Sequence, residues 1–168
     1  MARRQVKQDN GPVPVEYVAE FFIANADPDD PVTHLNVQNL CAYAQAYSLA
    51  LLDSRLFEDL LLEFPHGPAI KALLRKYKCY GKAPLATSLT AVQARRPFSY
   101  EQFFVLEQVN ATYGGYSPSG IRRKSHQDFP GTWWPRASRK TIPESAVKER
   151  FLQNPDVTWI IESANETS

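Results

Sequence analysis

The strongest hydrophobic pattern in the chain lies between residues 33 and 52 and predicts a long helix. Apolar side chains recur there at the three- and four-residue intervals of a helix face, behind Thr33, which is placed to cap the N-terminus. The stripe consists of Val37, Leu40, Cys41, Ala44, Tyr47 and Leu51. We expect this helix to form the core of the domain.

A shorter pattern predicts a first helix that begins at Val15. The apolar residues Val15, Val18, Ala19 and Phe22 recur at helical spacing, and the acidic, proline-containing stretch "ADPDDP" then ends the helix. Residues 1–14 are polar and basic and are interrupted by a Gly-Pro pair. We expect them to form a flexible N-terminal arm with nothing to pack against.

The stretch "PHGPAIKALLRKYKCYG", residues 65–81, predicts a helix that begins at a proline. Pro68 is suited to a first helical turn, where its missing N–H costs nothing, and Gly81 is suited to ending the helix. The apolar stripe between them is Ile70, Leu73, Leu74 and Tyr77. Most basic residues fall off this stripe, which predicts a solvated cationic side.

Three further helix starts follow. Ser99 and Gln102 have the spacing of a capping box, and the helix they begin should end at the glycine pair 114–115. Ser117 followed by a proline begins the next helix. The segment 141–144, "TIPE", begins another, in which Val147 packs with Phe151.

Other stretches have weaker patterns. Residues 54–64 fit a strand pair, an extended connection or a helix, and residues 82–98 predict a loop or a weak extended segment. "VTWII", residues 157–161, fits a short strand or a docking segment, and residues 162–168 predict a frayed C-terminal tail.

These patterns together predict a mainly α fold. We expect a compact single-domain bundle of about five to six helices over residues 15–161, with room for one small β-hairpin. Strands and helices do not alternate as in βαβ units, which argues against Rossmann and P-loop architectures.

Composition narrows the class of protein. The chain has 168 residues, 43% of them hydrophobic, which is long enough to bury a core without a disulfide or metal. No apolar run approaches the roughly 20 residues that a membrane span needs, and no export signal precedes the first helix. We expect a cytoplasmic protein with no membrane partner, in which Cys41 and Cys79 are buried free thiols.

Catalytic and metal-binding patterns are weak. None of the histidines His34, His66 and His126 has a neighbour at metal-ligand spacing. Ser125, His126 and Asp128 are close in sequence, but adjacent helical residues point in different directions and do not form a triad. We expect His126 to be a partly buried, hydrogen-bonded ring near a helix end, where the helix dipole favours its protonation. No phosphate-binding motif occurs, so we predict neither an enzyme nor a cofactor.

A partner surface is the better candidate. "FPGTWWPRAS" places two tryptophans beside basic residues, and Trp and Arg are enriched at binding hot spots. The predicted contact residues are Arg122, Arg123, Lys124, His126, Trp133, Trp134 and Arg136. A regulator that binds nucleic acid through the clusters 122–124 and 136–140 is the alternative, although a net charge of +1 argues against it.

A series of short motifs follows one another over about residues 15–153. They are Leu40, Tyr43, Ala44 and Gln45; Leu56 and Phe57; Phe64, Gly67 and Pro68; Tyr80 and Gly81; Ser125, His126 and Gln127; Trp133; and Ile142 and Pro143. In order and spacing this series resembles the Panacea domain, the family of phage-associated, GepA- and SocA-like prokaryotic antitoxins. The chain looks like a divergent member, because it has Asn36, Asn39 and Ala42 where the family often has Lys or Tyr.

This resemblance implies a function in a toxin–antitoxin system. Its members neutralise a toxin encoded beside them without catalysis, by binding it directly or by presenting it to a protease. The expected partners of this chain are therefore a cognate toxin and, in the second mode, a protease.

Overall fold

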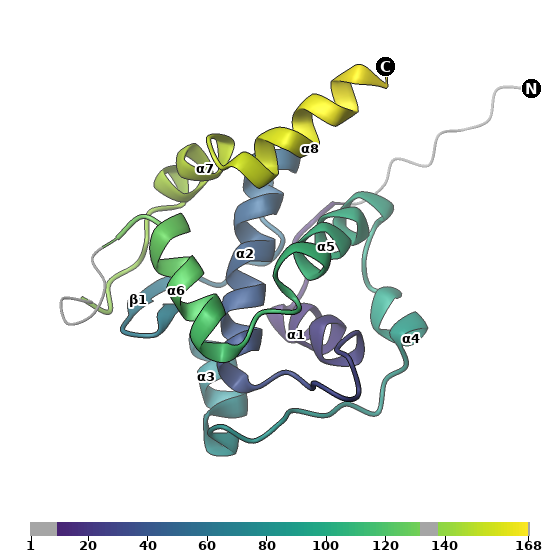
Figure 1. Cartoon of the computed structure of the whole chain (residues 1–168), viewed down its shortest axis with the longest axis vertical. Coiled ribbons are helices and arrows are strands. Elements are labelled where there is room, and N and C mark those ends of the chain that lie inside the picture. The colour runs from purple at the N-terminus through teal and green to yellow at the C-terminus, as the bar shows by residue number, and fades with distance from the viewer. Residues whose placement is uncertain (1–9, 132–137, 168) are drawn as a thin grey trace, which may run out of the picture.

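The computed structural model describes residues 10–131 and 138–167, and these residues form a mainly helical fold with one small antiparallel sheet. The elements are α1 (Val15–Ala24), α2 (His34–Leu52), β1 (Leu62–Phe64), β2 (Gly67–Ala69), α3 (Lys71–Tyr77), the 3-10 helix η1 (Lys78–Tyr80), α4 (Ala91–Arg95), α5 (Tyr100–Tyr113), α6 (Pro118–Asp128), α7 (Glu144–Leu152) and α8 (Pro155–Glu166). The predicted mainly α fold class is confirmed (Figure 1).

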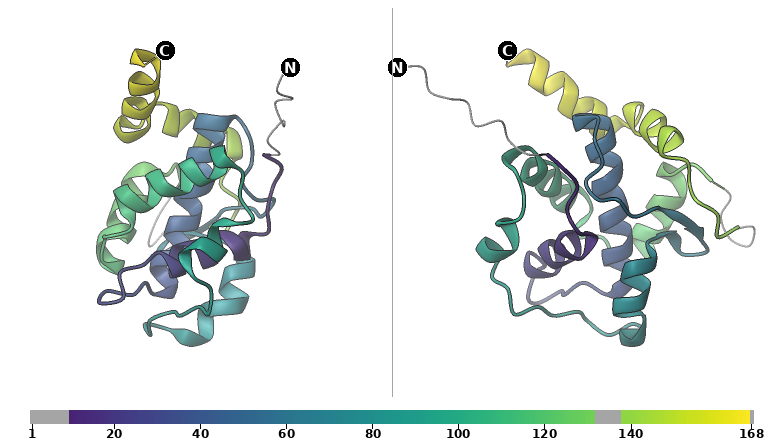
Figure 2. Two further views of the ribbon diagram at one scale, coloured as in Figure 1. Left: turned by 90° about the vertical axis from the view of Figure 1, so that its right-hand side faces the viewer. Right: turned by 180° about the vertical axis from the view of Figure 1, so that it is seen from behind.

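Helix α2 runs through the middle of the molecule. In Figure 1 and in the right-hand view of Figure 2 it lies between α1, α4 and α5 on one side and α6 and α7 on the other. The predicted core helix is therefore confirmed, but burial is not limited to one stripe. Its polar residues Asn36, Gln38, Asn39, Gln45 and Ser48 are buried as well.

Two of these polar side chains tie loops to α2. The Gln38 side chain accepts a hydrogen bond from the Ile70 N–H (2.9 Å) and donates one to the Ile70 carbonyl (3.2 Å). Gln45 accepts from the Leu56 N–H (2.8 Å) and donates to the Phe57 carbonyl (2.8 Å). A buried amide needs hydrogen-bond partners. Each glutamine side chain therefore bonds to a backbone N–H and a backbone carbonyl of an irregular segment, as a neighbouring strand would do in a sheet.

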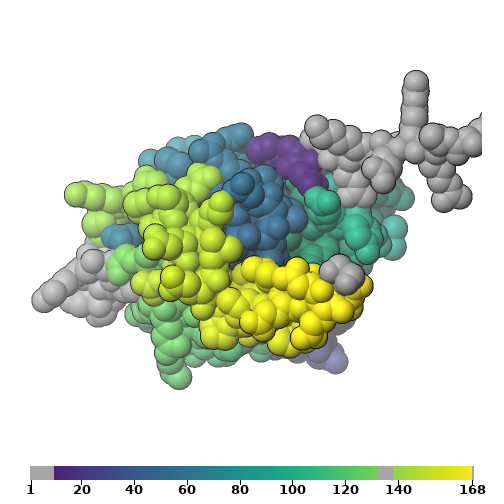
Figure 3. Space-filling view, turned by 90° about the horizontal axis from the view of Figure 1, so that it is seen from above, coloured from purple at the N-terminus to yellow at the C-terminus, as the bar shows by residue number. Residues whose placement is uncertain are grey.

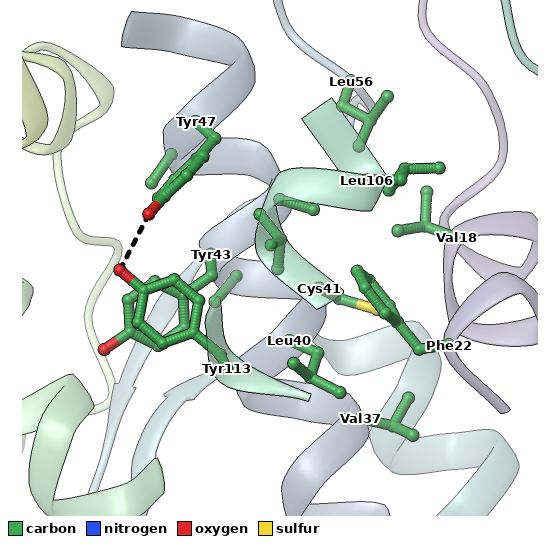
Figure 4. Packing of buried hydrophobic residues seen from close by; sticks show 14 of the residues in the cluster. Val18, Phe22, Val37, Leu40, Cys41, Tyr43, Tyr47, Leu56, Leu106 and Tyr113 are labelled. Atoms are coloured by element: carbon green, nitrogen blue, oxygen red, sulfur yellow. Dashed lines mark hydrogen bonds between the residues drawn. The ribbon is translucent and has the colours of Figure 1, made fainter. Parts of the chain in front are cut away.

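A group of buried tyrosines joins α2 to α5 and α6. The rings of Tyr43 and Tyr113 stack with centroids 3.8 Å apart, and the Tyr47 and Tyr113 hydroxyls form a 3.0 Å hydrogen bond (Figure 4). The Tyr43 hydroxyl donates to Asp128 Oδ2 on α6 at 2.7 Å. Burial raises the pKa of Tyr47 to about 12. These hydroxyls therefore remain protonated hydrogen-bond donors at neutral pH.

Residues 62–69 form a hairpin, which resolves part of the ambiguous stretch 54–64. Leu62 pairs with Ala69 and Glu63 with Pro68. Pro68 was predicted to begin a helix, and this was wrong, because Pro68 lies in β2 and α3 begins only at Lys71. The hairpin pairing with β1 outweighs the preference of proline for a first helical turn.

Two helices were missed in the sequence, so the count of five to six was too low. Helix α4 lies within residues 82–98, where a loop or extended segment was predicted. Thr90 and Gln93 form a capping box there: Thr90 Oγ1 accepts from the Gln93 N–H at 3.2 Å, and Gln93 Oε1 accepts from the Thr90 N–H at 3.0 Å. This motif was a usable sign of the short helix.

The segment "VTWII" lies in α8, so the short-strand alternative for it was wrong. Asn154 begins α8, since its Oδ1 accepts a hydrogen bond from the Asp156 N–H at 2.9 Å, and Pro155 occupies the first turn. The helix continues to Glu166 and so contains most of the tail that was predicted to be frayed. Figure 3 shows α8 in yellow lying across one end of the molecule.

The described part of the N-terminal segment is held against the fold. The Val13 N–H donates to the Leu56 carbonyl at 2.8 Å, and Gln102 Nε2 donates to the Gly11 carbonyl at 3.0 Å. The prediction of an arm with nothing to pack against therefore fails for residues 10–14.

Both cysteines were expected to be buried free thiols. Both are free thiols, but only Cys41 is buried, and Cys79 is exposed on η1.

Candidate functional site

A groove of about 750 Å³ lies beside the N-terminal end of α2. It is bordered by the start of α6, the hairpin, α3 and the turn after η1, and α6, β1 and α3 lie beside the lower end of α2 in Figure 1. Its wall is mainly apolar and includes Leu35, Phe64, Pro68, Ala69, Leu74 and Pro118. A second depression of about 300 Å³ adjoins it and shares Ser119 and Arg122 with the groove.

Local capping brings two helix starts to this groove. Thr33 caps α2 in a capping box with Asn36, and Ser117 Oγ caps α6 by accepting from the Gly120 N–H at 3.0 Å. Asn36 Nδ2 also donates to the Tyr116 carbonyl at 3.0 Å, which ties the start of α2 to the turn before α6. One wall of the groove is therefore positioned by side chains that the local sequence requires for helix capping.

The hairpin forms another wall of the groove, and Gly67 allows its close approach to the helices. Gly67 has φ +113°, and a Cβ atom there would lie 2.6 Å from Asn39 Oδ1 and 2.7 Å from Ser125 Oγ. Both atoms are closer than a side-chain carbon tolerates. Only glycine therefore lets β2 lie against α2 and α6 at this point.

The predicted basic residues on α6 do not all face the same part of the molecule. Arg122 lines both depressions, and Arg123 and His126 line the second one. Lys124 instead forms an ion pair with Asp128 Oδ1 at 3.5 Å, next to the hydrogen bond from Tyr43. Three of the four predicted α6 contact residues are thus brought together, and Lys124 is not.

The other predicted contact residues, Trp133, Trp134 and Arg136, lie outside the residues that the structure describes. Lys82, from the loop after η1, joins the groove lining and was missed in the sequence, as was Phe64. Phe64 was noted only as part of the motif with Gly67 and Pro68, and no pattern marked Lys82, because both residues reach the groove through the packing of the hairpin and of η1.

All three histidines of the chain border this region. His34 and His66 line the groove and His126 the depression beside it. Burial lowers the pKa of His34 and of His126, and the charge of Arg122 lowers that of His126 further, although a hydrogen bond with Pro65 opposes this. The expected partly buried, hydrogen-bonded His126 is confirmed, but burial and Arg122 lower the pKa of its ring in spite of the helix dipole.

The three side chains considered as a triad each contact different groups; they are Ser125, His126 and Asp128. Ser125 Oγ is bonded to the Arg122 carbonyl at 2.9 Å, and the Asp128 carboxylate is held by Tyr43 and Lys124.

Within residues 10–131 and 138–167, no three His, Cys, Asp or Glu side chains are close enough to hold a metal ion. Nor is any helix in these residues both long and apolar enough to cross a membrane.

No protein-family model, curated protein or solved structure matches this chain.

Proposed function

We propose that this chain is a non-catalytic, antitoxin-like protein that acts in the cytoplasm by binding and neutralising a toxin encoded nearby. The observation that carries the proposal is the groove, which is mainly apolar and has cationic side chains at its edge. Gly67, Pro68 and Phe64, which belong to the motifs shared with the Panacea domain, line this groove. The motif resemblance and the groove thus point to the same part of the molecule.

The size and lining of the groove suit a protruding segment of a partner protein. Its volume of about 750 Å³ is large enough to hold one or a few side chains, and small-molecule sites span roughly 300–1,000 Å³. Binding energy at protein interfaces concentrates in a few such apolar pockets, with polar groups around them. Occupation of the groove would either cover the toxin directly or hold it for a protease.

Co-expression with the protein encoded by the adjacent reading frame tests this function. We expect the chain to restore growth and to co-purify with that protein. Leu35→Glu should abolish both effects, because it places a charge in the apolar groove wall. An acidic residue in the first turn of α2 favours the helix, so loss of rescue would report on the groove rather than on folding.

Val92→Glu is the matched control. Val92 occupies the same second position of its helix as Leu35 does in α2, but it lies on α4 and is 69% exposed. This variant should rescue growth as well as the wild type. The proposal fails if the wild-type chain, correctly folded, neither binds nor rescues, or if both variants behave alike.

Nucleic-acid binding remains the competing function. Arg122, Arg123 and Lys82 gather on one face, whereas Lys124 is paired and Arg139 lies over the Phe64 ring at 5.4 Å. Retention on DNA or RNA that weakens steeply with salt would favour it, because phosphate contacts release counterions.

A further inference from the structure

The charged side chains that line the groove and the adjoining depression are all basic. Lys82 and Arg122 line the groove, and Arg123 adds to the depression, while no Asp or Glu among the described residues lines either. The chain as a whole has 19 basic and 18 acidic residues. A lining without any carboxylate therefore departs from the average surface and creates a local positive potential.

These cations are not neutralised from within the described fold. Other lysines of the chain are neutralised by carboxylates of the same fold, in the ion pairs Lys76–Glu20, Lys124–Asp128 and Lys148–Asp53. Lys82, Arg122 and Arg123 form no ion pair with any residue in 10–131 or 138–167. Their charges are therefore available to a ligand.

Two acidic side chains on the hairpin and on α6 have partners away from the groove. Glu63 lies on the hairpin next to Phe64, but its carboxylate accepts a hydrogen bond from Ser138 Oγ at 2.5 Å. Asp128 on α6 is bonded to Tyr43 and Lys124. Neither carboxylate lines the groove or the depression, so a carboxylate at Arg122 has to come from outside this part of the chain.

The apolar wall adds a second requirement. Leu35, Phe64 and Leu74 come from three different elements and line the same cavity that Arg122 and Lys82 border. A ligand that fills this cavity gains most if an apolar side chain enters it while carboxylates reach the cations. A purely polar anion would leave the apolar wall unoccupied.

We propose that the groove recognises an acidic segment of a partner protein, with a large apolar side chain in the cavity and Asp or Glu carboxylates at Arg122 and Lys82. This inference specifies the partner chemistry of the proposed function, and rests on it only in assuming a protein partner. Charge complementarity selects this occupant over a basic or neutral segment.

Selection from a random peptide library displayed on phage tests the inference without the toxin. Peptides that the wild-type chain enriches should carry Asp or Glu next to Leu, Phe or another large apolar residue. Their affinity, measured by fluorescence anisotropy, should fall about tenfold or more in the double variant Arg122→Glu/Lys82→Glu. That variant should instead enrich basic peptides.

Two further variants keep this test decisive. Arg122→Gln/Lys82→Gln should lose the acidic preference without reversing it, and should melt at the wild-type temperature because both side chains are unpaired in the described fold. Lys78→Glu/Arg96→Glu changes the net charge as much as the double reversal, at exposed positions outside the groove lining, and should keep the wild-type preference.

The inference is overturned if no peptides are enriched, if the enriched peptides have no acidic bias, or if the charge control changes the preference as much as the groove variant. Enrichment of acidic peptides together with failure of the toxin to bind would retain the groove chemistry and reject the antitoxin role. Preferred binding of a fluorescein-labelled single-stranded DNA over the selected peptides would assign the cations to phosphate instead.

Discussion

At the scale of single residues, Tyr43 combines apolar packing with a polar contact. Its ring stacks on Tyr113, and its hydroxyl donates to Asp128, which also pairs with Lys124. Burial and the charge of Asp128 raise the pKa of Tyr43 far above the usual range of tyrosine. The hydroxyl therefore acts as a permanent donor that links α2 to α6.

We expect Tyr43→Phe to keep the stacking and to lose the hydrogen bond. Because the bond is made to a charged group, the free energy of unfolding should fall by about 1–3 kcal/mol, measured by urea denaturation. Tyr17, which is 48% exposed, provides the control: Tyr17→Phe should change it by less than about 0.5 kcal/mol. Equal effects of the two variants would contradict the structural role of the Tyr43 hydroxyl.

Gly67 is the second position at which one residue decides local geometry. Gly67→Ala should destabilise the fold by about 1–3 kcal/mol or more, because it combines a positive φ with contacts shorter than 3 Å to Asn39 and Ser125. Gly115→Ala is the matched variant, since no atom lies within 4 Å of the added carbon there. Thermal melting should separate the two; a Gly67→Ala protein as stable as Gly115→Ala would refute this account of the hairpin.

At the scale of elements, α8 is stabilised both by its N-terminal cap and by packing of its side chains. The Asn154 side chain accepts hydrogen bonds from backbone N–H groups at the start of α8, and the buried side chains of the helix are Val157 and Ile160. Trp159 is 65% exposed, so it adds little to the packing. With only these two buried side chains, the helix depends strongly on its cap.

Asn154→Ala should therefore lower the free energy of unfolding by about 1 kcal/mol and reduce the helical circular-dichroism signal. Asn154→Asp keeps a side-chain acceptor for the Asp156 N–H and should retain most of the stability. If the alanine and aspartate variants were equally destabilised, the cap would not be the cause.

At the scale of the whole molecule, packing around α2 places His34 and His126 in the same region. Burial holds the pKa of both rings below the ordinary value of 6.5. As the pH falls through that value, the unfolded chain takes up protons that the folded protein does not. Stability is therefore fully present above about pH 7 and decreases as the pH falls below the unfolded pKa.

We expect the urea midpoint of the wild-type protein to fall between about pH 7.5 and about pH 5.5. The double variant His34→Gln/His126→Gln should show a clearly smaller fall over this range, because its side chains do not titrate. Val92→Gln, at an exposed position on α4, serves as the control and should keep the pH dependence of the wild type. A wild-type midpoint that does not change with pH would disprove the role of the two buried rings.

The success of the sequence predictions follows the range of the interactions involved. The starts of α2, α5 and α6 were predicted correctly, because Thr33, Ser99 and Ser117 cap amides within three residues of themselves. Pro68 was misassigned because its hairpin partner Glu63 is itself held by backbone hydrogen bonds to Arg139 and Lys140, far along the chain. The polar contacts of Gln38 and Gln45 were likewise invisible, since their partners lie 11 to 32 residues away.

The amino-acid sequence by itself determined the helical class, the central helix and most helix starts, because hydrophobic periodicity and capping act over one or two turns. Only the tertiary structure decided what surrounds α2 and which side chains meet in the groove. Arg122, Lys82, Phe64 and Leu35 come from four separate segments, and long-range packing alone sets their distances. A groove of this kind is therefore a property of the assembled fold and not of any local motif.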